Sequence, residues 1–104
     1  MTAKQHYMAG LGKLGAGDME GATRCFQDAL LAEVSFYIAH LGWAQALDRL
    51  GRVDEAIEQV QNALLFAPND PLVHTSLSRL YQQKGMILEA EQEMALSRKL
   101  SERT

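Results

Sequence analysis

Three histidines are the residues whose spacing first suggests chemistry. His6, His40 and His74 are equally spaced along the chain, so a regular fold would place them in one row. Imidazole nitrogens bind zinc at about 2.0–2.1 Å, whereas packed helices lie about 8–10 Å apart. One ion could therefore hardly bind all three rings, and the spacing favours packing or partial exposure over a metal site.

The other reactive side chains also lack the neighbours that catalysis needs. A reactive thiolate needs nearby cations, and only Arg24 stands beside Cys25 in the sequence. The glycines between residues 10 and 17 follow no predicted strand and precede no Lys-Ser/Thr pair, so they form no nucleotide-binding loop. We therefore expect no enzyme, no metal and no cofactor. The neighbouring carboxylates are expected on solvated helix turns: Asp54, Glu55, Glu89, Glu91 and Glu93.

The overall composition is that of an ordinary globular chain. The 104 residues are 47% hydrophobic and 22% charged, with a formal net charge of −3. This charge offers no basic surface for nucleic acid or anionic lipid, and no apolar stretch is long enough to span a membrane. With one cysteine no internal disulfide can form, and no signal peptide is evident, so we expect a cytoplasmic protein.

One constant period, the interval between the histidines, runs through the chain without a gap. At this interval one column holds only glycine, at positions 17, 51 and 85. Two further columns hold small residues, namely Ala22, Ala56 and Ala90, and Ala29, Ala63 and Ser97. A third column holds bulky apolar residues, namely Phe26, Val60 and Met94. Stacked copies of one unit, burying a continuous core, produce such a period. We predict a single domain, 1–104, with repeats at 3–36, 37–70 and 71–104.

Each repeat is predicted to form two helices. Residues 53–66 carry one apolar stripe, whereas residues 37–50 are apolar nearly all round, which predicts cover on more than one side. The column glycines can close each first helix in a left-handed conformation. Asp70 and Pro71 are typical of an N-cap and a first helical residue, and Ser35 is the cap expected at the earlier junction. The predicted helices are 3–16, 19–33, 37–50, 53–66, 71–84 and 87–101.

These columns resemble the tetratricopeptide repeat family over residues 3–104. The middle repeat is nearest to the family pattern, through Trp43, Ala44, Leu47, Gly51, Ala56, Val60, Ala63 and Pro68. The resemblance implies an all-α, right-handed α-solenoid of three helix-turn-helix hairpins, with six antiparallel helices. It also implies a non-catalytic scaffold or adaptor that binds a partner peptide or helix in a concave groove.

The first repeat departs most from the family pattern. Ala9 and Lys13 stand where larger apolar or aromatic residues are usual. Its first helix also contains Gly10, Gly12 and Gly15, and each interior glycine costs about 0.5–1 kcal/mol relative to alanine. We therefore expect this end of the solenoid to fray first.

The resemblance assigns groove positions to the first helix of each repeat. Arg49 and Arg79 beside apolar side chains predict a protein or peptide partner with apolar anchors and an acidic group, unless these residues are merely solvated or packed. A subclass of the family clamps a carboxylate with Lys and Asn, but here the clamp positions hold Tyr7, Leu11, Gly42, Leu72 and Ser76. The groove residues are Lys4, Tyr7, Leu11, Ile38, Leu41, Gln45, Arg49, Leu72, Thr75, Arg79 and Gln82, with Leu14, Asp48 and Gln83 beside them.

The last repeat differs where the family faces a following repeat. Glu91 and Arg98 replace Ile57 and Leu64 of the middle repeat, which resembles a solvated cap and predicts a natural end of the chain. Apolar residues expected to stay partly exposed at this end are Leu77, Leu80 and Ile87. The alternative function is therefore a self-associating structural unit that forms a homo-oligomer through its terminal helix faces.

Overall fold

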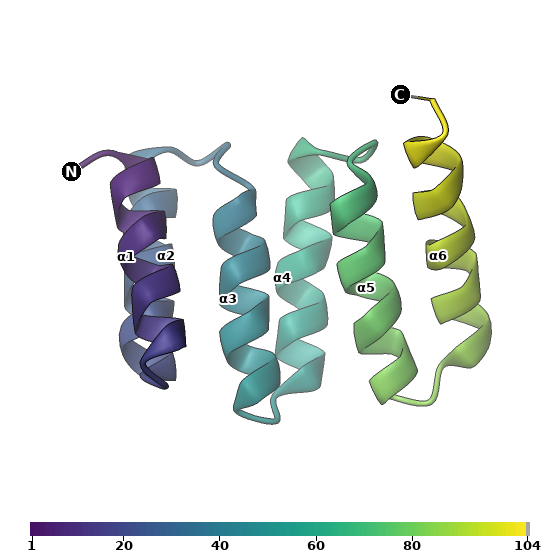
Figure 1. The fold of residues 1–104 in the computed structure, drawn as a ribbon, viewed down its shortest axis with the longest axis horizontal. Helices are drawn as coiled ribbons and strands as arrows, with labels where there is room; N and C mark the ends of the chain where they lie inside the picture. Colours follow the sequence, from purple (N-terminus) through teal and green to yellow (C-terminus); the bar gives the residue numbers. More distant parts are fainter. Residues whose placement is uncertain (104) are drawn as a thin grey trace.

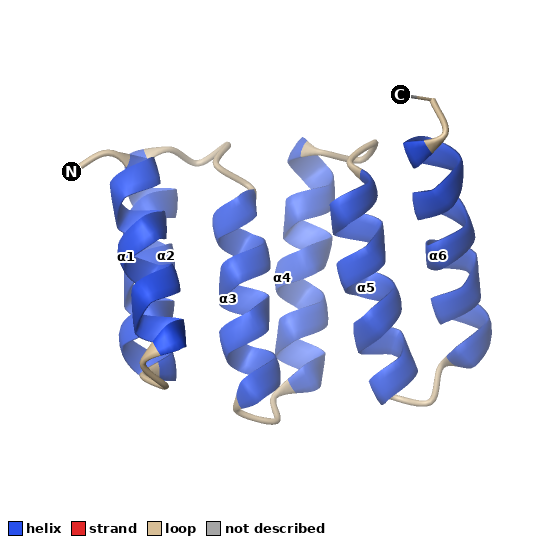
Figure 2. Ribbon diagram, in the orientation of Figure 1, coloured by secondary structure: helices blue, strands red, loops and turns tan. Residues whose placement is uncertain are grey.

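The computed structural model describes residues 1–103, in which helices alternate in direction along the chain (Figure 1). All the regular secondary structure of these residues is helical (Figure 2). The first helices of the three pairs lie in front in Figure 1, with α2 and α4 behind them. The helices are α1 (Ala3–Gly15), α2 (Met19–Ala32), α3 (Ile38–Arg49), α4 (Val53–Phe66), α5 (Pro71–Gln83) and α6 (Ile87–Ser101). The predicted all-α solenoid of paired helices is confirmed.

The glycine column closes each first helix as predicted. Gly17, Gly51 and Gly85 have φ values of 80°, 77° and 77°, in the left-handed region that side chains with a Cβ disfavour. The turn that follows is short, so each second helix runs back antiparallel to the first (Figure 1). These three residues therefore set the repeated hairpin geometry.

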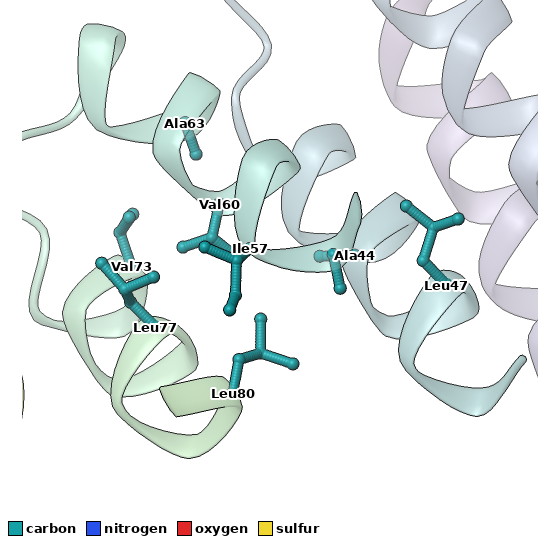
Figure 3. Packing of buried hydrophobic residues seen from close by; sticks show 9 residues of the cluster. Ala44, Leu47, Ile57, Val60, Ala63, Val73, Leu77 and Leu80 are labelled. Carbon is teal, nitrogen blue, oxygen red and sulfur yellow. The ribbon is translucent and has the colours of Figure 1, made fainter. Parts of the chain in front are cut away.

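The core between the second and third pairs is a continuous apolar contact. Ile57 and Val60 of α4 point at Val73, Leu77 and Leu80 of α5 (Figure 3). Leu77 is 2% exposed and Leu80 5% exposed, so the expectation that both stay partly exposed at the C-terminal end was wrong. They lie on the face of α5 that meets α4, and only Ile87 of that predicted set is exposed.

Helix α3 is covered on several sides, as its nearly uniform apolar composition predicted. It contacts α2 and α4 extensively and also touches α1 and α5. Trp43 packs against both apolar clusters of the protein, one centred on Phe26 and the other on Val60. The middle pair thus joins the two clusters into one core.

The two junctions between pairs are built differently. Asp70 caps α5 by accepting the backbone N–H of Leu72 at 2.9 Å, and Pro71 is the first helical residue, as predicted. Asp70 also accepts a hydrogen bond of 2.5 Å from the Tyr37 hydroxyl. The prediction that Ser35 caps α3 was wrong, because α3 begins only at Ile38 and has no side-chain cap.

No helix in the described part of the chain is long and apolar enough to cross a membrane.

Candidate functional site: the groove along the first helices

A groove of about 290 Å³ opens along the first helices, between α3 and α5 with α1 at one end. Residues of α3 and α5 form most of its lining, and α1 contributes only Tyr7. Because this concave space is bounded by three separate helix pairs, it exists only when the pairs are stacked. The lining residues are Tyr7, Ile38, Leu41, Gly42, Ala44, Gln45, Asp48, Val60, Leu72, Thr75, Ser76, Arg79 and Leu80.

The repeat places equivalent stripes of α3 and α5 side by side. Spacings of three and four residues put side chains on one face of a helix, as in the stripe Ile38, Leu41, Gln45 and Asp48 of α3. The stripe on α5 consists of Leu72, Thr75 and Arg79, each one full repeat after its α3 counterpart. A single helix pattern, repeated, therefore builds most of the groove.

Most of the predicted groove residues line this space. They are Tyr7, Ile38, Leu41, Gln45, Leu72, Thr75 and Arg79, together with the neighbouring Asp48. Lys4, Leu11, Gln82 and Gln83 are exposed but are not among its lining residues, and Leu14 is buried in the core. The groove is centred between α3 and α5, so α1 meets it at one turn only.

Arg49 is directed away from the groove. Its Nη1 atom donates to the backbone carbonyl of Leu14, 3.1 Å away, in the last turn of α1. A cation is favoured there because the carbonyl end of a helix carries partial negative charge. The prediction that both Arg49 and Arg79 lie in the groove was therefore wrong for Arg49, and only Arg79 lines it.

Tyr7 is fixed at the α1 end of the groove by two aromatic neighbours. Its ring lies 5.8 Å from that of Phe26 and 5.7 Å from that of Phe36, the second contact being edge-to-face. Burial of the phenol raises the pKa of Tyr7 above its ordinary value. The ring is thus a rigid apolar wall with a neutral hydroxyl.

Thr75 presents an acceptor to the groove because its proton is already used. Ser97 donates its hydroxyl to the carbonyl of Pro71 at 3.0 Å, and carbonyl oxygens only accept. The 2.7 Å contact between Thr75 Oγ1 and Ser97 Oγ is therefore donated by Thr75. The remaining lone pairs and the methyl group of Thr75 stay available to a ligand.

The sequence reasoning missed Ala44, Val60 and Leu80 as lining residues and named Gly42 and Ser76 only as positions where clamp residues are absent. Gly42, Ala44 and Ser76 lie beside the predicted stripe, and Val60 and Leu80 reach the groove from the core. Ser76 bonds to its own helix through the carbonyl of Leu72 at 2.9 Å. Small size was the available signal, since small residues between larger ones leave space above the backbone.

Two residues of the histidine column, His40 and His74, join the two helices of a pair. His40 Nδ1 lies 2.9 Å from Gln59 Oε1, and His74 Nδ1 lies 2.7 Å from Glu93 Oε2. The second ring nitrogen of His74 donates to the carbonyl of Pro68 at 2.6 Å. Within residues 1–103 no three His, Cys, Asp or Glu side chains are grouped so that they could hold a metal ion.

Solved structures of several proteins share this fold. A crystal structure of MamA has a TM-score of 0.89 at 20% identity, covering 98% of this chain and 60% of that one. The Yersinia enterocolitica type III secretion chaperone SycD, in complex with a peptide of the translocator YopD, has a TM-score of 0.85 at 23% identity, over 93% and 74%. The second TPR of Spaghetti (RPAP3), bound to the HSP90 peptide SRMEEVD, has a TM-score of 0.86 at 19% identity, over 94% and 91%.

The sequence comparisons give the family. This chain spans about 60% of the length of the MamA chain, and no curated protein matches its sequence. The sequence pattern of the tetratricopeptide repeat matches residues 13–80, which is more than half of the chain. The columns, the hairpin geometry and this match agree: the chain belongs to the tetratricopeptide repeat family.

Proposed function

We propose that this protein is a non-catalytic interaction scaffold that holds a segment of a partner protein in the groove of α1, α3 and α5. The observation that carries the proposal is the groove itself, with apolar walls from Tyr7, Ile38, Leu41 and Leu72 and polar groups at its edge. An apolar cleft with a few directed polar groups is the usual form of a peptide-binding site. In a reducing, cytoplasmic setting the single Cys25 would stay a free thiol.

The partner is expected to offer apolar anchors and an acidic group. Arg79 is exposed on the groove wall, and its side chain has no partner in residues 1–103. Two of the similar structures hold peptides, and the peptide on RPAP3 contains two glutamates and a terminal aspartate. An acidic group near Arg79 would form a charge-assisted hydrogen bond. The clamp residues for a terminal carboxylate are absent, so we propose a different, internal acidic side chain.

Leu72→Glu tests the groove with little risk to folding. Leu72 is 55% exposed, so a charge is tolerated there, yet it would replace an apolar anchor contact. Peptides are first selected from a random-peptide phage library on the wild-type protein, and their affinities are measured by fluorescence polarisation. We expect Leu72→Glu to weaken binding about tenfold, as for a central interface residue.

The matched control is Leu65→Glu on α4. Leu65 is 78% exposed and is not among the groove-lining residues, so the same change should leave peptide affinity unaltered. If no library peptide loses affinity on Leu72→Glu, or if both variants behave alike, the groove is not the binding surface and the proposal fails.

A second candidate, self-association, is favoured by exposed apolar side chains on α6, the last helix of the solenoid. Ile87, Leu88 and Leu96 of α6 are exposed. At the opposite end α1 exposes Met8 at 57%, but its other exposed residues include the small or polar Gln5, Ala9, Gly12 and Lys13. A head-to-tail chain of copies would need two complementary ends, whereas two α6 faces could pair about a two-fold axis.

Sedimentation velocity over a wide concentration range tests the second candidate. A dimer that dissociates on Leu88→Glu supports pairing through α6. A constant monomer mass at every concentration, in wild type and variant alike, removes self-association from consideration.

A further inference from the structure

Asp48 holds a carboxylate where the helix itself disfavours one. It is the penultimate residue of α3, lines the groove and is half-buried. The carbonyl end of a helix carries partial negative charge, so an anion in the last turn is destabilising. Among residues 1–103 its side chain forms no hydrogen bond and no ion pair. The protein thus keeps an uncompensated negative charge inside its groove.

The cations that could neutralise Asp48 are directed elsewhere. Arg49, the next residue, donates to the carbonyl of Leu14. Lys13, at the end of α1, lies 3.9 Å from Asp18. Arg79 lines the same groove but is not within ion-pair distance of Asp48. The carboxylate is therefore available to a ligand.

The repeat pattern does not require an acid at this position. The equivalent residues of the other first helices are Leu14 and Gln82, one buried and one exposed, and neither carries a charge. Packing therefore gives no reason for Asp48, since an uncharged residue occupies the same column twice. A role in recognition does explain a partly buried, unpaired charge that lines a cleft.

We infer that Asp48 binds a cationic side chain of the segment held in the groove, so the ligand carries a lysine or arginine for Asp48 and an acid for Arg79. This inference rests on the proposed function. It adds a basic side chain to the expected ligand and fixes the orientation in which the segment lies in the groove. Arg79 is one helix pair further along than Asp48 and one turn nearer the start of its helix. A segment with its two charges reversed would place like charges together at both positions, which opposes binding.

A charge-reversal selection tests the inference. A random dodecapeptide phage library is selected in parallel on wild type, Asp48→Lys and the control Glu58→Lys. Glu58 is exposed on α4 and does not line the groove, so its reversal changes net charge equally. Lysine suits the C-terminal turn of a helix, so Asp48→Lys should fold, and a circular dichroism melt verifies this.

The expected result is a change of preference at one peptide position. Wild type and Glu58→Lys should select a basic residue at a fixed offset from the apolar anchor, and Asp48→Lys an acidic residue at the same offset. A peptide selected on wild type should bind Asp48→Lys at least about fivefold more weakly, and its Lys→Glu version should recover affinity for that variant.

Two other results overturn the inference and are distinguishable from each other. Peptides that depend on Leu72 but show no fixed basic residue, or bind Asp48→Asn as tightly as wild type, leave the groove as a binding site and remove Asp48 from recognition. If no selected peptide depends on Leu72, the proposed function and this inference fail together.

Discussion

The first and second helix pairs fill the same position of the repeat in opposite ways. Phe26 of α2 and Val60 of α4 occupy one column of the repeat, and both are fully buried. The Phe26 ring is flanked by Gly10 and Gly42, and a Cβ on these residues would lie 2.5 Å and 2.7 Å from the ring atom Cε1. A large side chain in this column is therefore accommodated by removing side chains on both neighbouring first helices.

Around Val60 the distribution of volume is reversed. The positions equivalent to Gly10 and Gly42 are Ala44 and Ser76, so the smaller valine is matched by larger neighbours. Close packing requires the summed volumes to agree, and the repeat satisfies it twice with different residues. The position of a residue in the repeat therefore fixes where its side chain lies in the core. The volume that this side chain can have depends on the residues at two other positions of the repeat.

The largest expected effect comes from emptying the first of these two sites. Phe26→Ala should lower the free energy of unfolding by about 3–5 kcal/mol, because a buried ring leaves a cavity that glycine neighbours cannot fill. Val60→Ala should cost about 2 kcal/mol, since fewer methyl groups are lost. Urea denaturation followed by circular dichroism measures both. A larger loss at Val60 than at Phe26 would contradict the volume comparison.

Filling the glycine gap should give the next largest effect. Gly10→Ala places a Cβ against the Phe26 ring, and overpacking of this kind costs about 1–3 kcal/mol. Gly12, two residues along α1, has no atom within 4 Å of the corresponding Cβ position. Gly12→Ala should therefore stabilise by up to about 1 kcal/mol through helix propensity alone.

The double variant Gly10→Ala/Phe26→Val tests whether the two sites are interchangeable. It reproduces in the first pair the combination that Ala44 and Val60 form in the second. We expect it to be more stable than the sum of the two single changes predicts, because the two positions share one space. Simple additivity would show that the first pair is not governed by this exchange of volume.

Much of the fold could be predicted from the sequence, because the columns are a local and repeated signal. The predicted helices differ from the observed ones by at most a residue or so at each end. The errors lie where the signal is not repeated: Ser35 has no equivalent that caps, and the first junction lacks the proline of the second. Leu77 and Leu80 were assigned to the exposed C-terminal end of the solenoid, whereas they lie on the face of α5 that packs against α4.

The groove was predictable as a set of columns but not as a set of free side chains. The family resemblance assigned the stripe on α3 and α5, and helix periodicity places its residues on one face of each helix. Whether Arg49 is free depends on the carbonyl of Leu14, which belongs to another helix pair. Periodicity also gave no reason to separate Asp48 from its neighbours, because its lack of a partner is visible only in three dimensions.

The two junctions between the helix pairs also differ, and substitutions there should change the free energy of unfolding by less than the core substitutions do. Asp70→Ala should destabilise by about 1 kcal/mol, since α5 loses its N-cap. Ser35→Ala at the first junction should change stability by less than about 0.5 kcal/mol, because Ser35 caps no helix. Thermal melts of the two variants measure the difference. Equal losses would mean that the first junction has a cap in solution.

The smallest expected effect is a change in the pKa of one tyrosine, because the pKa values of Tyr7 and Tyr37 are raised by different causes. The hydrogen bond to Asp70, with a smaller contribution from burial, raises the pKa of Tyr37 above 10.0, whereas burial alone raises the pKa of Tyr7. A raised pKa means that folding favours the neutral phenol. Its contribution to stability is therefore complete below pH 10 and is lost as the pH rises through the folded-state pKa.

Titration of tyrosinate absorbance can assign these causes, with Tyr7→Phe and Tyr37→Phe identifying each signal. Asp70→Ala should bring the pKa of Tyr37 back toward 10.0 and leave the pKa of Tyr7 unchanged, because only Tyr37 bonds to Asp70. If Tyr37 titrates alike with and without Asp70, this hydrogen bond does not hold the second junction in solution. The two junctions would then differ in the cap of α5 and in the prolines of the second junction.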